Sequence, residues 1–89
     1  MHYVYVLHCA DNKLYIGFSD NVRNRIRQHR AGEVRSTKHR LPLSIVSIEC
    51  YVNRADATSR EVFLKSGAGH KQLKRQHQRR LGELGYKYL

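Results

Sequence analysis

Cysteine, proline, tryptophan and acidic side chains are all scarce in this sequence of 89 residues. It contains two cysteines, one proline, no tryptophan and only seven Asp and Glu together. Cys9 and Cys50 lie far apart, and neither belongs to a C-x-x-C pair or to a zinc-finger spacing with histidine. A disulfide framework and a structural zinc site are therefore disfavoured, and we expect two buried free thiols.

Long apolar runs are also missing. No stretch approaches the roughly 20 apolar residues that a membrane-spanning helix needs. The N-terminus begins directly with strand-like sequence, so no signal peptide is expected. We therefore expect no membrane partner and a cytoplasmic location, associated with the nucleoid if the source is bacterial.

Positive charge is what the sequence has in excess. The 17 Lys and Arg outnumber the seven acidic residues, which gives a net charge of +10. A hydrophobic content of 40% argues against a disordered basic tail. A folded surface this basic favours a polyanionic partner, and nucleic acid is the first candidate.

The first half of the chain has the pattern of a hairpin followed by a helix. Residues 3–9 and 14–19 are rich in Tyr, Val, Ile and Leu, and a short polar break separates them. A Ser-Asp-Asn cap at 19–21 then predicts a helix that ends near Ala31, where Gly32 stops it. A basic loop follows and closes at Pro42.

The second half has the pattern of one strand and two helices. Residues 43–52 predict a strand with Val46, Ile48, Cys50 and Val52 on its inner face. A helix capped by Asn53 or Asp56 should run to about Ser66, where 67–69 break it. A basic helix at about 70–80 and a short tail at 81–89 complete a single domain, 1–89. The order predicts an α+β fold with a small antiparallel sheet covered by helices.

The predicted hairpin brings two tyrosines together. A loop of three residues places Cys9 opposite Lys13 and Tyr5 opposite Gly17, with Tyr15 diagonal to Tyr5 on the same face. Two phenols would then converge above a glycine that leaves room for a ligand. The alternative is that both tyrosines are core residues with solvated hydroxyls.

The first helix carries a candidate phosphate site. Val22 and Ile26 define its buried direction, and Arg25 and His29 fall in the same sector. An arginine can bind an oxyanion with two hydrogen bonds, and a histidine can move a proton near neutral pH. The alternative is an amphipathic helix whose arginine packs its stem and keeps its head in water.

The second helix carries a candidate metal ligand. Its inner stripe is expected at Ala55, Thr58 and Val62, and Glu61 lies on the edge of that stripe. One carboxylate together with substrate phosphate can hold Mg²⁺. The alternative is an ordinary ion pair between Glu61 and Lys65, four residues apart.

Basic residues of the loop and of the last helix are further candidate phosphate contacts, which would position nucleic acid without reading its sequence. They are Lys38, His39 and Arg40 in the loop, and Lys71, Lys74 and Arg75 in the last helix.

Together these motifs resemble the GIY-YIG nuclease superfamily over about residues 2–80. Tyr5 within Val-Tyr-Val and the run Tyr15-Ile16-Gly17 are similar to the paired motif, although the first triplet keeps only its tyrosine. Arg25 with His29 resembles the helix motif R-x-x-x-H, and Glu61 resembles the glutamate that binds metal. The chain is most similar to small stand-alone members that are like the N-terminal domain of the C component of excinuclease ABC.

The resemblance implies a three-stranded antiparallel sheet flanked by helices and hydrolysis of DNA with one Mg²⁺ or Mn²⁺ ion, in repair or recombination. In that scheme Tyr5 orients or helps to deprotonate the attacking water, with Tyr15 close by and His29 a candidate base. Arg25 stabilises charge on the phosphate, Glu61 holds the metal and Gly17 leaves space.

One departure from the family pattern favours a second reading. Many members carry an asparagine in the helix after the glutamate, whereas every asparagine of this chain precedes Glu61, so Gln72 or Gln76 would have to substitute. The chain is therefore either a nuclease that is structure-selective or weakly sequence-specific, or a nucleic-acid-binding module that has lost turnover. A small interaction protein on a ribonucleoprotein is a third possibility. Because 89 residues leave no room for a separate recognition domain, target choice would depend on DNA structure or a targeting protein.

Overall fold

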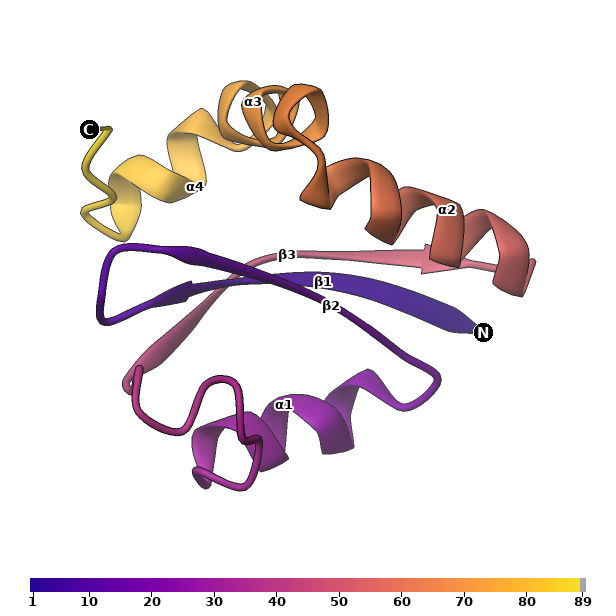
Figure 1. Ribbon diagram of the computed structural model, residues 1–89, viewed down its shortest axis with the longest axis horizontal. Coiled ribbons are helices and arrows are strands. Elements are labelled where there is room, and N and C mark those ends of the chain that lie inside the picture. The colour runs from indigo at the N-terminus through magenta and orange to yellow at the C-terminus, as the bar shows by residue number, and fades with distance from the viewer. Residues whose placement is uncertain (89) are drawn as a thin grey trace.

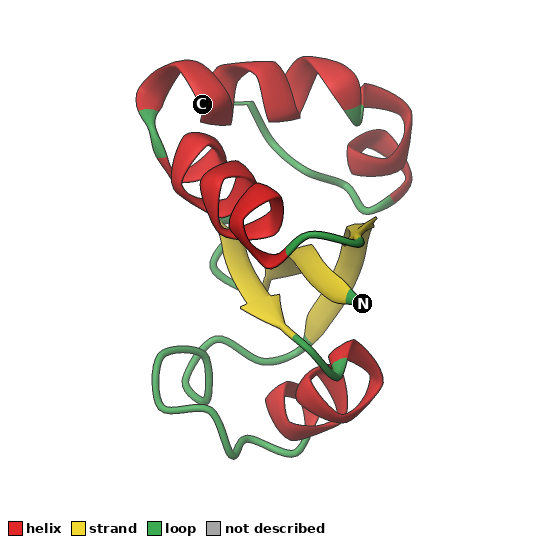
Figure 2. Ribbon diagram, turned by 90° about the vertical axis from the view of Figure 1, so that its right-hand side faces the viewer, coloured by secondary structure: helices red, strands yellow, loops and turns green. Residues whose placement is uncertain are grey.

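The computed structural model describes residues 1–88 and contains three layers. A central antiparallel sheet has the strand order β2-β1-β3, and helices cover both of its faces (Figures 1 and 2). This arrangement confirms the predicted α+β fold with a three-stranded sheet. The elements are β1 (His2–Cys9), β2 (Leu14–Ser19), α1 (Val22–Arg30), β3 (Leu43–Tyr51), α2 (Arg54–Lys65), α3 (Gly67–Gln76) and α4 (Gln78–Glu83).

The β1–β2 hairpin has the predicted register. The Cys9 N–H donates to the Lys13 carbonyl at 2.9 Å, and Tyr5 lies opposite Gly17. Asn12 adopts a positive φ of 65°, a conformation that asparagine tolerates better than most residues. The short loop therefore determines which face of the sheet every hairpin side chain occupies.

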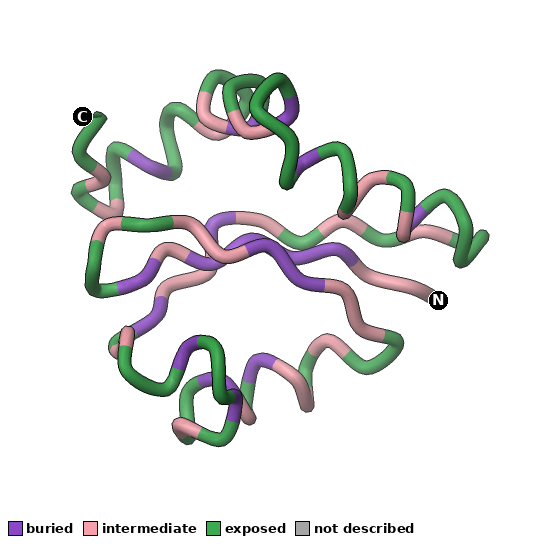
Figure 3. The backbone as a smooth tube through the Cα atoms, in the orientation of Figure 1, coloured by how far each residue is buried: buried purple, intermediate pink, exposed green. Residues whose placement is uncertain are grey.

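The sheet has a separate apolar core on each face. Helices α2, α3 and α4 cover one face, and α1 with the loop at 31–42 covers the other (Figure 1). Strand β1 lies between the two cores and is the most continuously buried strand (Figure 3). The first core contains Val4, Val6, Ile16, Val46, Ala57, Leu64, Leu73 and Leu81, and the second contains Tyr5, Leu7, Cys9 and Leu43.

Strand β3 contains an irregularity that the sequence pattern did not reveal. Val6 pairs with Ser47 but Leu7 pairs with Ile45, so Val46 is an extra residue in β3. Val46 packs in the core under α2–α4, whereas Ile48 is 44% exposed beside α1. The prediction that Val46 and Ile48 share an inner face is therefore wrong, and Cys50 is exposed instead of buried.

Helix α2 is rotated relative to the prediction. Asn53 caps it by accepting from the N–H groups of Ala55 and Asp56, and Ala57 and Leu64 face the sheet. Val62 is 70% exposed, so the expected stripe through Ala55 and Val62 is wrong. Small and polar residues occur on every side of this helix, which left its buried face undetermined by periodicity alone.

The glycine-rich segment begins a helix and does not simply break one. Ser66 ends α2 and also caps α3, because its hydroxyl accepts from the Gly69 N–H at 3.1 Å. A Cβ at Gly69 would lie 1.8 Å from the Phe63 carbonyl oxygen, so only glycine allows this close approach. The predicted basic helix at 70–80 therefore begins earlier and is interrupted at His77, and Leu81 of the expected tail is fully buried.

Among the described residues, no helix combines the length and apolar character that crossing a membrane requires.

Candidate active site

The site begins with a tyrosine that lies across a glycine. Tyr5 is almost fully buried on the central strand, and its ring lies over Gly17 of the neighbouring strand β2. A Cβ at Gly17 would lie 2.4 Å from both the Cζ and the hydroxyl oxygen of Tyr5. Any side chain at Gly17 would displace the phenol, so the Tyr5 ring can lie across β2 only because this residue is a glycine.

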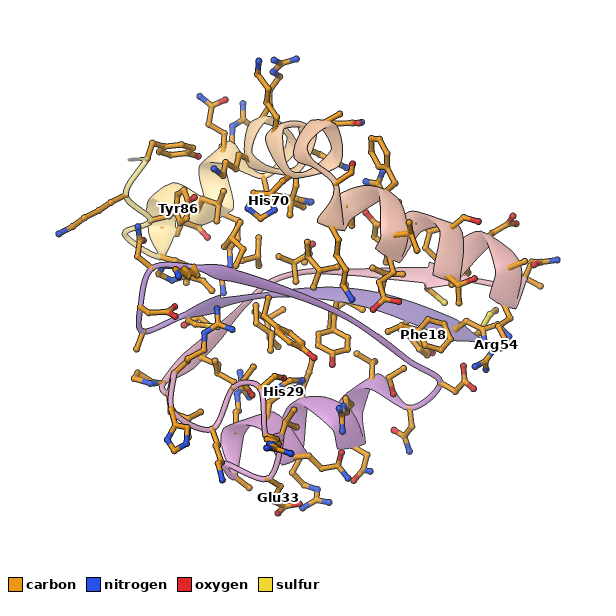
Figure 4. All side chains as sticks on the ribbon, in the orientation of Figure 1. Phe18, His29, Glu33, Arg54, His70 and Tyr86 are labelled. Atoms are coloured by element: carbon orange, nitrogen blue, oxygen red, sulfur yellow. The ribbon has the colours of Figure 1, made fainter. Side chains whose placement is uncertain are left out.

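Two tyrosines and a histidine form one compact cluster. The rings of Tyr15 and His29 are 5.0 Å apart, those of Tyr5 and His29 are 5.5 Å apart, and the two tyrosine rings are 6.3 Å apart. The Tyr5 hydroxyl lies 2.8 Å from His29 Nε2. Figure 4 shows His29 between α1 and the sheet. Helix phase and hairpin register together bring these three side chains into contact.

A threonine that the sequence reasoning missed orients the histidine. Thr37 Oγ1 lies 2.7 Å from His29 Nδ1, and both residues are fully buried. A neutral imidazole has one donor and one acceptor nitrogen. The ring of His29 therefore accepts one of its two hydrogen bonds, from Tyr5 or Thr37, and donates the other. Nothing in the basic loop marked Thr37 as a site residue, because its partner lies on another element.

Burial controls the protonation of this cluster. Burial raises the pKa of Tyr5 to about 12, with the nearby Arg25 guanidinium acting in the opposite direction. Burial also lowers the pKa of His29 to about 4, and the positive charge of Arg25 lowers it further. At neutral pH the pair therefore consists of a protonated phenol and a neutral imidazole.

The charged candidates lie on helices that cover opposite faces of the sheet (Figure 1). Arg25 is half-buried on α1, where its Nη1 donates to Gln28 Oε1 at 3.2 Å. Glu61 is on α2, and its charge, like that of Tyr15, acts to raise the pKa of Tyr5. The structure thus places one cation and one carboxylate within electrostatic range of the same phenol.

Glu61 is the predicted metal ligand. Its Oε2 accepts from Lys65 Nζ at 3.1 Å, so the ordinary ion pair is also formed. Within residues 1–88, no group of three or more His, Cys, Asp or Glu is arranged to hold a metal ion. A hard cation that uses one protein carboxylate together with water and substrate oxygens fits this donor set, and a zinc-like site does not.

The two predicted sets of phosphate contacts lie on opposite faces of the sheet. Lys38 and His39 are exposed on the α1 side, whereas Lys71 and Arg75 are exposed on α3 (Figure 1). Arg40 is already paired with an acid, because its Nε donates to Asp11 Oδ2 at 2.8 Å. Lys74 lies over the ring of Tyr86, 5.9 Å from its centroid. These residues therefore do not form a single patch around Tyr5.

Neither glutamine replaces the family asparagine at the Tyr5 cluster. Gln72 is exposed on α3, and Gln76 Oε1 accepts from Arg60 Nη2 at 3.3 Å. Arg60 in turn forms two hydrogen bonds with Glu49, at 3.0 and 3.1 Å. Gln76 therefore belongs to a separate polar network under α2.

Comparisons with known proteins identify the family of this chain. The family model described as the GIY-YIG catalytic domain matches residues 1–77. A UPF0213 protein of Haloquadratum walsbyi is 44% identical over 66 residues, which cover 73% of this chain and 74% of that protein. A UPF0213 protein of Staphylococcus haemolyticus is 39% identical over 74 residues, covering 82% and 90%.

A solved structure agrees as well. The solution NMR structure of a UPF0213 protein from Bacillus halodurans superposes with a TM-score of 0.56 at 31% identity, and covers 84% of this chain and 83% of that one. The chain therefore belongs to the GIY-YIG family and carries its nuclease-type catalytic domain, as a relative of the UPF0213 proteins.

Proposed function

We propose that this chain hydrolyses phosphodiester bonds of DNA with one divalent cation, Mg²⁺ or Mn²⁺, in repair or recombination. The observation that carries the proposal is the 2.8 Å hydrogen bond between the Tyr5 hydroxyl and the buried His29 imidazole, with Tyr15 against both rings. A phenol held by a neutral imidazole is a route for proton transfer.

The buried histidine acts through Tyr5. His29 and Tyr5 are 0% and 1% exposed, and both ring nitrogens of His29 are already hydrogen-bonded, to Tyr5 and Thr37. The attacking water therefore reaches the imidazole only through the Tyr5 oxygen, once substrate binding has admitted it. As the water gives a proton to that oxygen, the Tyr5 hydroxyl passes its own proton to His29 Nε2, and the resulting hydroxide attacks phosphorus. The bond between phosphorus and the leaving oxygen breaks, and the leaving oxygen takes up a proton from solvent. This relay needs the tautomer in which His29 Nδ1–H donates to Thr37.

The charges around Tyr5 complete the proposed machinery. The Arg25 guanidinium binds the phosphate oxygens and stabilises the charge that grows on them in the transition state. A phosphate paired with Arg25 also offsets the positive charge that lowers the pKa of His29, which makes the imidazole a better proton acceptor. Glu61 holds the divalent cation, which when bound supplies Lewis-acid stabilisation of the phosphate or the leaving oxygen.

A binding module without turnover is the second candidate. Two observations favour it: Gln76 is bound to Arg60, and Glu61 is already paired with Lys65. In that case the exposed basic residues on both faces would hold nucleic acid, and the Tyr5 cluster would be a satisfied part of the core.

Nicking of supercoiled plasmid DNA in Mg²⁺ separates the two candidates. We expect nicking by the wild-type chain and at least a hundredfold loss in Arg25→Ala and Glu61→Gln. The matched controls are Arg35→Ala and Glu33→Gln, which remove the same charges from exposed positions and should keep activity. Equal nicking by wild type and both site variants would point to a contaminant and contradict the proposal. DNA binding without nicking would favour the binding module.

A further inference from the structure

A groove between α1 and β3 has an apolar floor and a basic rim. Its volume is about 560 Å³. Ile48 on the floor is 44% exposed, and Val52 just beyond β3 is 82% exposed. The floor consists of Val22, Ile26, Ile45 and Ile48, and the rim consists of Arg23, Arg27 and Arg30.

The groove lies beside an open sheet edge. Strand β3 pairs with β1 on one side only, within the part of the chain described. The backbone groups of odd-numbered β1 residues form hydrogen bonds with β2, as Cys9 does with Lys13, so those of even-numbered β1 residues face β3. In β3, the partners of the even-numbered residues point inward and the residues between them point outward. The backbone groups of Ile48 and Cys50 therefore point outward, where another strand can pair with them.

One end of this edge is already closed. Arg80 Nε donates to the carbonyl oxygen of Ile45 at 2.9 Å, so a side chain occupies the edge there. The open part is thus the half of β3 from Ile48 to Tyr51, next to the groove. An exposed apolar edge with free backbone groups is a surface that folded proteins normally protect or use.

The positive charge of the rim favours an acidic occupant. None of its three arginines takes part in an ion pair among residues 1–88, and Arg27 bonds only the neutral Asn24 side chain, at 2.8 Å. A second copy of this chain would bring a net charge of +10 and the same arginines to the contact. Nucleic acid would leave the aliphatic floor uncovered, because the lining has no aromatic ring on which a base could stack.

We propose that the groove binds an extended segment of a partner protein in which apolar, preferably β-branched, residues are interspersed with Asp or Glu. The segment adds a fourth strand to the sheet at Ile48 and Cys50, its apolar side chains cover the floor, and its carboxylates pair with the rim arginines. Tyr5 on β1 pairs with Ile48, but its ring extends over Gly17 of β2, away from the β3 edge, so the segment leaves that site open. The inference stands whether or not the chain cleaves DNA.

Selection from a library of random nine-residue peptides tests this inference. Peptides are displayed against the folded wild-type chain and counter-selected against the double variant Ile48→Asn, Arg27→Ser. We expect enrichment of acidic peptides with alternating β-branched residues, a tenfold or greater loss of affinity in the double variant, and unchanged affinity in Arg35→Ser. Amide chemical shifts of the wild-type chain should change at Ile48–Tyr51 when a selected peptide binds, and circular dichroism should show that the variants stay folded.

Three results would overturn the inference. One is the absence of any enriched sequence class. Another is equal binding of the selected peptides to the double variant, or amide shifts confined to α3 and the loop at 31–42. The third is a short DNA duplex that shifts the same groove amides and displaces the peptides, because the groove would then belong to a nucleic-acid surface.

Discussion

Acid should destabilise this protein through one buried histidine. His29 is fully buried between Tyr5 and Thr37, and burial with the charge of Arg25 lowers its pKa from 6.5 to about 4. Between these two pH values the unfolded chain binds a proton at His29 and the folded chain does not. The free energy of unfolding therefore falls as the pH is lowered from 6.5 towards 4, and this contribution is fully restored above pH 6.5.

The magnitude follows from the pKa shift. A change from 6.5 to about 4 corresponds to about 3.5 kcal/mol at roughly 1.4 kcal/mol per pKa unit, of which about 3 kcal/mol is lost by pH 4, where His29 is half protonated in the folded chain. A domain of this size is stabilised by only about 5–10 kcal/mol, so the loss is a large fraction of the total. It should lower the melting temperature by about 12 °C or more.

Urea unfolding followed by circular dichroism at pH 7 and pH 4, at constant ionic strength, measures the effect. The comparison is with His29→Gln, which keeps a donor and an acceptor but does not titrate. Carboxylates titrate in both proteins, so their contribution cancels in the difference. Burial also lowers the pKa of His77, and His77→Gln is the matched control that separates its contribution in the same direction.

Two outcomes would refute this reasoning. In the first, wild type and His29→Gln lose the same stability between pH 7 and pH 4. In the second, an NMR titration of the His29 ring protons gives a pKa at or above 6. Either result would mean that the ring is hydrated or paired in a way that the buried Tyr5–His29–Thr37 arrangement does not allow.

Three further predictions concern packing. Gly17→Ala should force the Tyr5 ring away from His29 and lower the free energy of unfolding by about 1–3 kcal/mol, measured in urea, with loss of any nicking activity; unchanged stability would contradict the close contact. Gly69→Ala places a methyl group on the Phe63 carbonyl and should be more destabilising still, with a lower melting temperature as the readout. Leu64→Ala should cost about 2–5 kcal/mol and Val62→Ala less than about 0.5 kcal/mol. If Val62→Ala were the more destabilising of the two, the buried face of α2 expected from the sequence would be correct after all.

Local rules predicted the hairpin and the first helix. The three-residue loop sets the register of β1 and β2, so the placement of Tyr5 opposite Gly17 followed from the sequence. Asn21 accepts from the Asn24 N–H and starts α1, and Val22 and Ile26 gave its buried direction. Each of these features depends on residues only a few positions apart.

Long-range packing decided what the sequence could not. The extra residue Val46 in β3 and the rotation of α2 depend on how each element fits the sheet. A single added residue exchanges the inner and outer faces for the strand residues beyond it, and no pattern of neighbouring residues predicts its position. The contact between Thr37 and His29 likewise depends on the loop folding back over α1.

The sequence by itself determined a small basic α+β domain of the GIY-YIG family and the residue types of its site. Those results rest on composition, short motifs and loop length, which act locally along the chain. Only the tertiary structure decided that His29 is buried against Tyr5 and that the predicted phosphate contacts lie on two opposite faces of the sheet. It also decided that Ile48 faces an open groove. Burial and charge proximity are properties of the assembled layers, and they control which of those residues water, phosphate or a partner can reach.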